Sequence, residues 1–314
     1  MRALIEAVRP ALGALVTDRS FAKVVGVAEQ LPRELSKSYG FEYRFGGEGV
    51  DFLFSVNDAE RSHAILSPSV GGAPAWAPVL ALFDAWQRAP LQGAIRNIWL
   101  ELDTSAAPAA APSVFIRPVA HGIGAGARAA FGHLVESTRS ILSARARTNA
   151  LPRILDALPP GAIVPQVGFM LARETTAFRL CAQLPGPEIP AALARLGWSG
   201  SPAALAEVLS ELLPHAGTTV LLSLDVDGSV GDRVGVELYG QEGKMEAAAF
   251  IALFDRLVAR GLCRDDERAA ILAWHGRSDE VRRGINHVKI VFEPRGAVAA
   301  KAYLAFFPRA ARSA

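Results

Sequence analysis

Strand-like segments come in pairs along this chain, and helical segments separate the pairs. This order constrains the fold more than any other feature of the sequence. The strand pairs fall within 41–56, at 94–105 and 112–119, at 163–174 and 177–184, at 218–228 and 232–240, and at 287–294 and 298–307. Helical spacing of apolar residues covers 2–17, 20–37, 76–89, 127–147, 151–158, 188–196, 202–213, 244–260 and 265–274.

Short connections within each pair predict antiparallel strands, and helices between pairs fall on one face of the sheet. Ten such strands in a flat sheet would leave the other face bare. Closing the sheet removes the edges and turns the bare face into a lumen. We therefore predict an α+β fold: a closed ten-stranded antiparallel barrel of repeated αββα units with the helices outside. The prediction is one domain over 1–314, with N-terminal helices over 1–37 and barrel repeats over 41–307.

Alternation along the strands supports this prediction, because odd and even positions point to opposite faces. In 98–103 the aliphatic residues alternate with Trp99, Glu101 and Asp103, and in 287–293 they alternate with His287, Lys289 and Glu293. An ordinary sheet with one solvated face shows a similar alternation. Large aromatic residues and paired charges on the polar face favour the lumen over that alternative.

Basic residues recur on this polar face, each on a different strand. They are Arg117, Arg179, Arg233, Lys289 and Lys301. Like charges that converge in a lumen repel one another unless an anion lies between them, and a diphosphate suits guanidinium groups well. The alternative is that they form cross-strand ion pairs with acids on the same face.

Composition excludes several classes of protein. Apolar residues make up 51% of the chain and the net charge is +2, which excludes a disordered chain. Two cysteines exclude a disulfide framework, and no apolar run is long enough to span a membrane. Charges of both signs are scattered, so we expect neither nucleic acid nor membrane as a partner and a cytoplasmic location.

The αββα repeats, the basic residues on successive strands and the closing segments VKIVFEP and AKAYLAFF resemble the αββα-barrel (ABBA, or PT-barrel) prenyltransferases. That superfamily includes aromatic and indole prenyltransferases and the peptide-modifying enzymes of cyanobactin pathways. The resemblance implies a transferase of natural-product biosynthesis that moves an allylic isoprenoid, such as dimethylallyl, geranyl or farnesyl, from its diphosphate to an aromatic or peptide acceptor. It also implies that the five basic residues bind the diphosphate, with no organic cofactor.

The resemblance further implies that Tyr239 and Tyr303 shield the allylic cation and that a carboxylate deprotonates the acceptor. Glu101 or Asp51 could be this base, and we favour Glu101 because Trp99 lies on the same face. Trp99 and Phe115 complete the expected cation shield and acceptor pocket. The chain departs from the family pattern in having only four tyrosines and many acids on the polar face. These acids could hold Mg²⁺ near the diphosphate or bind a cationic acceptor.

Two other functions fit the same residues. One is a non-catalytic barrel that binds an acidic amphipathic ligand, which predicts diphosphate affinity without turnover. The other is an unrelated α+β repeat enzyme. It predicts that the basic residues are dispersed and that a mutation of Lys289 has little effect on the protein's activity.

Overall fold

A single antiparallel sheet closes on itself in the computed structural model, which describes residues 1–314 except 48, 106–109, 121–123, 174 and 310–314. The strands run in chain order from β1 to β8, followed by β10 and β11, and β11 pairs with both β10 and β1. Every pairing is antiparallel. The predicted closed ten-stranded barrel is therefore confirmed. A strand of two residues, β9, pairs with the first residues of β10.

The strands are β1 (Tyr39–Arg44), β2 (Val50–Val56), β3 (Ile95–Leu102), β4 (Ser113–Pro118), β5 (Ile163–Phe169), β6 (Phe178–Gln183), β7 (Val220–Asp227), β8 (Ser229–Tyr239), β9 (Gly276–Arg277), β10 (Val281–Glu293) and β11 (Gly296–Pro308). The helices are α1 (Arg2–Leu12), α2 (Asp18–Ala28), α3 (Ala59–Val70), α4 (Ala77–Trp86), α5 (Ala125–Ile141), α6 (Leu151–Ala157), α7 (Ile189–Arg195), α8 (Pro202–Leu212), α9 (Ile251–Ala259) and α10 (Asp265–Trp274).

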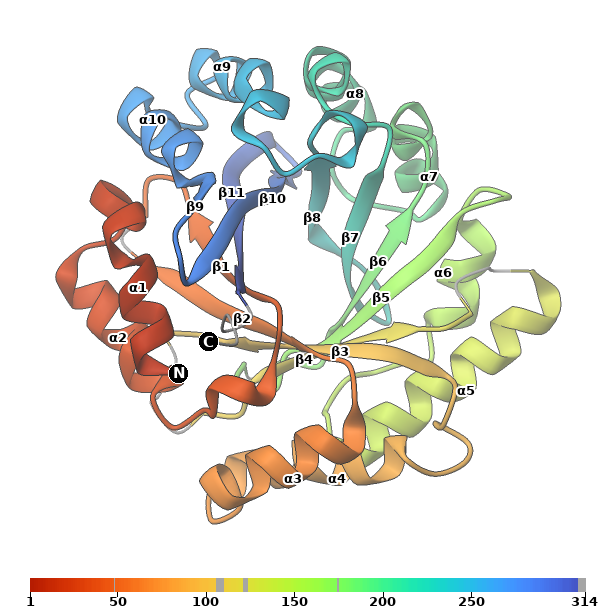
Figure 1. Ribbon diagram of the computed structural model, residues 1–314. Coiled ribbons are helices and arrows are strands. Elements are labelled where there is room, and N and C mark those ends of the chain that lie inside the picture. The colour runs from red at the N-terminus through yellow and green to blue at the C-terminus, as the bar shows by residue number, and fades with distance from the viewer. Residues whose placement is uncertain (48, 106–109, 121–123, 174, 310–314) are drawn as a thin grey trace.

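Successive pairs of helices surround the barrel in chain order, from α1 and α2 to α9 and α10 (Figure 1). The core lies between these helices and the outer face of the sheet. Outward strand residues such as Ile98, Leu100, Val236 and Leu238 are fully buried there. Burying one such side chain contributes about 1.5–3 kcal/mol, so this layer rather than the lumen stabilises the fold.

Trp274 ties the last helix to the closing strands. Its indole Nε1 donates to the carbonyl oxygens of Gly284 on β10, at 3.1 Å, and Ala305 on β11, at 3.2 Å. The ring also packs edge-on against Phe41 and Phe306. This side chain therefore joins α10 to the strands between which the sheet closes.

Local sequence explains how several helices begin and end. Asp58 accepts a hydrogen bond from the backbone N–H of Arg61 and caps α3, and Ser201 caps α8 in the same way. Gly197 and Gly261 follow helices with φ of 70° and 68°, values that favour glycine. No helix in the described part of the chain is long and apolar enough to cross a membrane.

Several predicted boundaries were wrong. The predicted helix over 20–37 ends at Ala28, and Pro32 precedes only a short 3₁₀ turn, because proline removes a backbone donor. The predicted helix over 244–260 begins only at Ile251. Helix α3 and strand β9 were not predicted, since the 59–70 segment carries Pro68 and few apolar residues. The closing pair is longer than expected, starting at Val281.

Candidate functional site

A cavity of about 380 Å³ lies inside the barrel, lined by inward side chains from β2 to β8, β10 and β11. Pockets that take small molecules are of this size or larger. Eight of the predicted site residues line it: Trp99, Glu101, Phe115, Arg117, Arg179, Tyr239, Lys289 and Tyr303. The alternation of the strands therefore placed these side chains on the correct face.

Two predicted residues do not line the cavity. Arg233 is exposed near the end of the barrel where β7 turns into β8, and it forms an ion pair with Glu293 at 3.1 Å. Lys301 faces the lumen, but its Nζ is held by Oε1 of Glu42 at 2.6 Å. We expected five basic side chains to converge in the lumen, and three of them line the cavity. Alternation along a strand predicts which face of the sheet a side chain is on, but not its position along the barrel axis.

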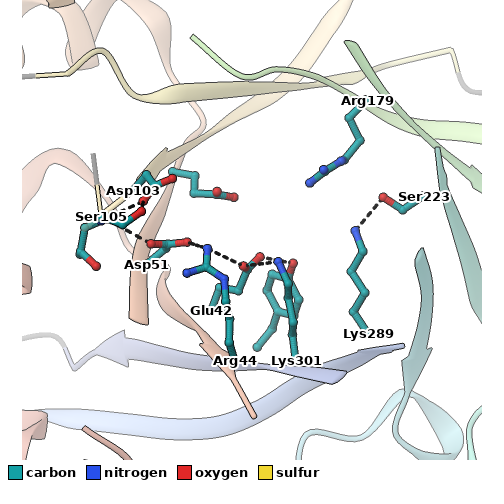
Figure 2. A network of polar contacts seen from close by, with 12 residues as sticks. Glu42, Arg44, Asp51, Asp103, Ser105, Arg179, Ser223, Lys289 and Lys301 are labelled. Atoms are coloured by element: carbon teal, nitrogen blue, oxygen red, sulfur yellow. Dashed lines mark hydrogen bonds and ion pairs between the residues drawn. The ribbon is translucent and has the colours of Figure 1, made fainter. Parts of the chain in front are cut away.

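Arg179 and Lys289 reach the cavity from β6 and β10 (Figure 2). The Arg179 guanidinium donates two hydrogen bonds to the Asp225 carboxylate, at 2.8 and 3.0 Å. Burial opposes the charge on Asp225, but Arg179 lowers the pKa of that carboxyl below its ordinary value. Nζ of Lys289 donates to Oγ of Ser223 at 2.7 Å and lies 3.4 Å from Oε1 of Glu237. Cross-strand ion pairs therefore hold these cations at the wall.

Glu101 on β3 is a buried carboxyl at the cavity wall, 4% exposed. Its Oε1 lies 3.3 Å from Nη2 of Arg173, which also contacts Asp103 at 3.5 Å. Burial, together with the neighbouring Glu42 and Asp51, raises the pKa of Glu101 to about 7. A carboxyl with this pKa exchanges protons near neutral pH, as a general base must.

Asp51 occupies a different position from Glu101. It does not line the cavity, because Arg44 and the backbone N–H of Thr104 hold its carboxylate. Burial and the nearby Glu42 raise its pKa to about 6. Of the two acids considered as a base, only Glu101 reaches the cavity.

Glu42 is the centre of a buried polar network at one side of the cavity (Figure 2). It accepts hydrogen bonds from Lys301 and from the Tyr303 hydroxyl, and Arg44 pairs with both Glu42 and Asp51. Although burial opposes it, Lys301 and Arg44 lower the pKa of Glu42 below its ordinary value. The network fixes the hydroxyl end of Tyr303 and leaves its ring at the cavity.

Tyr239, His287 and Tyr303 form a wall of three rings on neighbouring strands β8, β10 and β11. The imidazole lies 4.0 Å from the Tyr303 ring in a stacked arrangement and 4.9 Å from the Tyr239 ring in a tilted one. Such aromatic faces attract cations, by about 2 kcal/mol or more where water is excluded.

Basic and acidic side chains both line the cavity: Arg117, Arg179 and Lys289, with Glu101 and Glu237. Asp225 forms an ion pair with Arg179, and Glu237 lies 3.4 Å from Nζ of Lys289. Glu101 is about half protonated near pH 7. Among the described residues no ion pair holds Arg117, so its guanidinium is available to a ligand. Nor does the described part of the chain contain a cluster of three or more acids, histidines or cysteines that could hold a metal ion.

Sequence reasoning missed three members of the site. Glu42 and Arg44 alternate with Phe41 and Tyr43 on β1, so the alternation used for the other strands could have found them. Arg173 follows β5 in a turn, where no periodicity exists to place a side chain.

Similarity to solved structures supports the barrel over nearly the whole chain. The apo form of the prenyltransferase PriB superimposes with a TM-score of 0.61 at 14% identity, covering 98% of this chain and 94% of PriB. A 6-dimethylallyl tryptophan synthase superimposes with a TM-score of 0.59 at 12% identity, covering 96% of this chain and 94% of the synthase. PriB in ternary complex with L-tryptophan and dimethylallyl thiolodiphosphate gives 0.57.

No protein-family model matches the sequence, and comparison with curated proteins finds no match. The structural likeness, at 14% identity or less, establishes the fold. This chain therefore adopts the αββα-barrel fold of the prenyltransferases that it resembles in the order of its elements.

Proposed function

We propose that this protein is a prenyltransferase that moves an allylic isoprenoid from its diphosphate to an acceptor inside the barrel. The observation that carries the proposal is the content of the cavity. Three basic side chains, an aromatic wall and one buried carboxyl with a pKa near 7 line the same cavity. The fold shared with PriB and with a 6-dimethylallyl tryptophan synthase supports this function.

The diphosphate would bind to Arg117, Arg179 and Lys289. Arg179 and Lys289 are held from behind by Asp225 and by Ser223, so their positions are fixed before a ligand arrives. Donors that are fixed in advance stabilise the negative charge that grows on the leaving oxygens without further reorganisation. Lys301 would support this site indirectly through Glu42 and Tyr303, and the exposed Arg233 would take no part.

The allylic cation would form against the aromatic side chains. Tyr239 and Tyr303 present their rings from one side of the barrel, and Trp99 and Phe115 form a cross-strand pair on β3 and β4. Aromatic side chains packed around the cation would also exclude the water that would otherwise capture it.

Glu101 would accept the proton that the acceptor loses. Its raised pKa keeps it basic enough for this task at neutral pH, and Trp99 two residues earlier shares its face. Proton transfer by a positioned group contributes about 10²–10⁴-fold to a rate. The acceptor binds between Glu101 and Trp99 in this proposal.

We propose an aromatic acceptor of the indole class. PriB, which shares the fold, has been crystallised with L-tryptophan and dimethylallyl thiolodiphosphate. An aromatic side chain of a peptide would satisfy the same wall. Cytoplasmic location is part of the proposal, because both cysteines are buried and unpaired.

Titration calorimetry with the unreactive dimethylallyl, geranyl and farnesyl thiolodiphosphates tests the donor site, with and without Mg²⁺. We expect micromolar binding of at least one analogue, and the tightest chain length identifies the donor. Mass spectrometry of incubations with the matching diphosphate and L-tryptophan or tryptophan-containing peptides then tests turnover. Binding without any product would favour the non-catalytic barrel, and no binding of any analogue would refute the prenyltransferase.

A further inference from the structure

Arg173 is a basic residue to which the proposed function gives no role. It lies between β5 and β6, in the turn at one end of the barrel, and its side chain extends to the end of β3. There its Nη2 lies 3.3 Å from Oε1 of Glu101 and 3.5 Å from Oδ2 of Asp103. One nitrogen of Arg173 thus pairs with two carboxylates.

The two carboxylates are much less exposed than the arginine. The side chains of Glu101 and Asp103 are 5% and 9% exposed, whereas that of Arg173 is 35% exposed. An ion pair between two exposed side chains contributes little to stability, but a buried carboxylate that loses its partner keeps an uncompensated charge. Loss of Arg173 should therefore affect the ionisation of Glu101, unlike loss of an ordinary surface arginine.

The contact with Arg173 involves only one oxygen of Glu101. Among the described residues Oε1 has this hydrogen-bond partner and Oε2 has none. Because Glu101 lines the cavity, Oε2 is the oxygen that a ligand there can reach. Arg173 therefore restricts the carboxylate without occupying the atom that would accept a proton.

Asp103 can hold Arg173 whether or not Glu101 carries a proton. Its Oδ1 accepts hydrogen bonds from the backbone N–H of Ser105 at 2.9 Å and from the Ser105 hydroxyl at 2.6 Å (Figure 2). Although burial opposes it, Ser105 and the charges of Arg173 and Arg44 lower the pKa of Asp103 below its ordinary value. Asp103 is thus ionised at neutral pH, and the guanidinium keeps a partner when Glu101 is neutral.

Other charged and titratable groups surround Glu101. They are Glu42 and Arg44 on β1, Asp51 on β2, Asp103 after β3, Arg173 after β5, Arg179 on β6 and Tyr303 on β11. Burial and the carboxylates of Glu42 and Asp51 raise the pKa of Glu101 to about 7, against the opposing effect of Arg173 and Arg179. Within the described part of the chain, Arg173 is the one basic residue that forms an ion pair with Glu101.

We propose that Arg173 is a positioning residue, which holds Oε1 of Glu101 at the end of the barrel and leaves Oε2 to accept the proton of the acceptor. This inference rests on the proposed function. In that step the bond between the acceptor and its proton breaks, the electron pair stays with the acceptor, and the proton binds Oε2. Glu101 becomes neutral, and Arg173 remains paired with Asp103.

Three variants test this role. Arg173→Gln removes the charge, and Arg173→Lys retains it. Arg233→Gln is the matched control, because Arg233 also lies near a turn at this end of the barrel and pairs with an acid, Glu293, outside the cavity. Prenylation rates are measured from pH 5 to pH 9, and circular dichroism confirms that each variant is folded.

Arg173→Gln should move the acid limb of the pH–rate profile about one unit or more to higher pH, because Glu101 loses the charge that favours its ionised form. Its rate should fall about fivefold or more at pH 7 and return close to that of the unmodified protein at pH 9. Arg173→Lys and Arg233→Gln should leave the profile in place.

A second measurement does not depend on prenylation. At pH 8.5, Glu101→Gln should raise the urea midpoint more in the Arg173→Gln background than in the unmodified protein, because ionised Glu101 without its partner destabilises the fold more. At pH 4.5, where Glu101 is protonated in the folded protein, the two increases should be nearly equal.

A rate of Arg173→Gln that is reduced by the same factor at every pH would indicate a structural role alone and would overturn the inference. Equal increases of the urea midpoint in both backgrounds at pH 8.5 would also overturn it. Absence of product from the unmodified protein with every donor and acceptor would instead refute the proposed function, and the urea experiment would still measure the coupling of Arg173 to Glu101. The two failures are thus distinguishable.

Discussion

Replacing Glu101 by glutamine should stabilise the protein at alkaline pH and at the same time remove the group that we propose as the base. Glutamine has the shape of a protonated glutamate but cannot ionise. Burial and the neighbouring Glu42 and Asp51 raise the pKa of Glu101 from its ordinary value of 4.5 to about 7. Between these two values the folded protein keeps a proton that the unfolded chain releases, so folding becomes less favourable as pH rises.

The magnitude follows from the two pKa values. A tenfold difference in proton affinity corresponds to about 1.4 kcal/mol. A carboxyl whose pKa moves from 4.5 to about 7 therefore costs the folded state about 3 kcal/mol above pH 7 and almost nothing below pH 4.5. Glu101→Gln removes this cost, so its advantage should grow across this range and then level off.

Urea unfolding at pH 4.5, 6, 7 and 8.5 measures the difference directly. Asp225→Asn is a control of opposite sign: although burial opposes it, Arg179 lowers the pKa of Asp225, so that variant should lose stability above pH 4. Glu101→Gln should also reduce prenylation by at least about 100-fold. Parallel stability curves for Glu101→Gln and the unmodified protein would refute the reasoning, because they would show that Glu101 ionises normally.

Three further predictions follow from positions around the cavity. Arg179→Ala should weaken thiolodiphosphate binding about tenfold or more in calorimetry, whereas Arg233→Ala, at an exposed residue, should leave it within twofold. Gly168→Ala would place a methyl group against the Phe115 ring and push that ring into the lumen. The variant should lose about 1–3 kcal/mol in urea unfolding and bind acceptor less well, and an unchanged affinity would argue against Phe115 in the acceptor pocket. Trp274→Phe should lower stability by about 2 kcal/mol, since the indole N–H serves two strand carbonyls, and unchanged thermal unfolding would contradict this.

Much of the fold could be predicted because its main signals are local. Paired strands with short turns and amphipathic helices between them can be seen in any window of ten to twenty residues. The closure of the barrel followed from a global requirement, that no sheet face or edge remain uncovered, and the pairing of β11 with β1 confirms it. Helix ends were less predictable, since caps and 3₁₀ turns depend on single residues such as Pro32.

The site could be predicted in part because alternation along a strand is also a local signal in the sequence. Alternation identified which strand residues face inward, and eight of the candidates line the cavity. It could not give their height along the axis, so Arg233 was grouped with residues far deeper in the barrel. Nor could it show which cation would be bound by which acid, because the Lys301–Glu42 pair joins residues at opposite ends of the sequence.

Pairing of β1 with β11 also has a consequence for how the protein folds. Tyr39 lies opposite Phe306, so the sheet closes only after nearly all of the barrel sequence has been synthesised. Contacts at such long separation in sequence form slowly. Until β11 has paired with β1, the side chains that β11 contributes to the lumen, including Tyr303, are not in place. The strands at the two ends of the unclosed sheet are then open edges that could pair with another chain. A ligand of the lumen can therefore stabilise the finished barrel but cannot assist the earlier steps of its assembly.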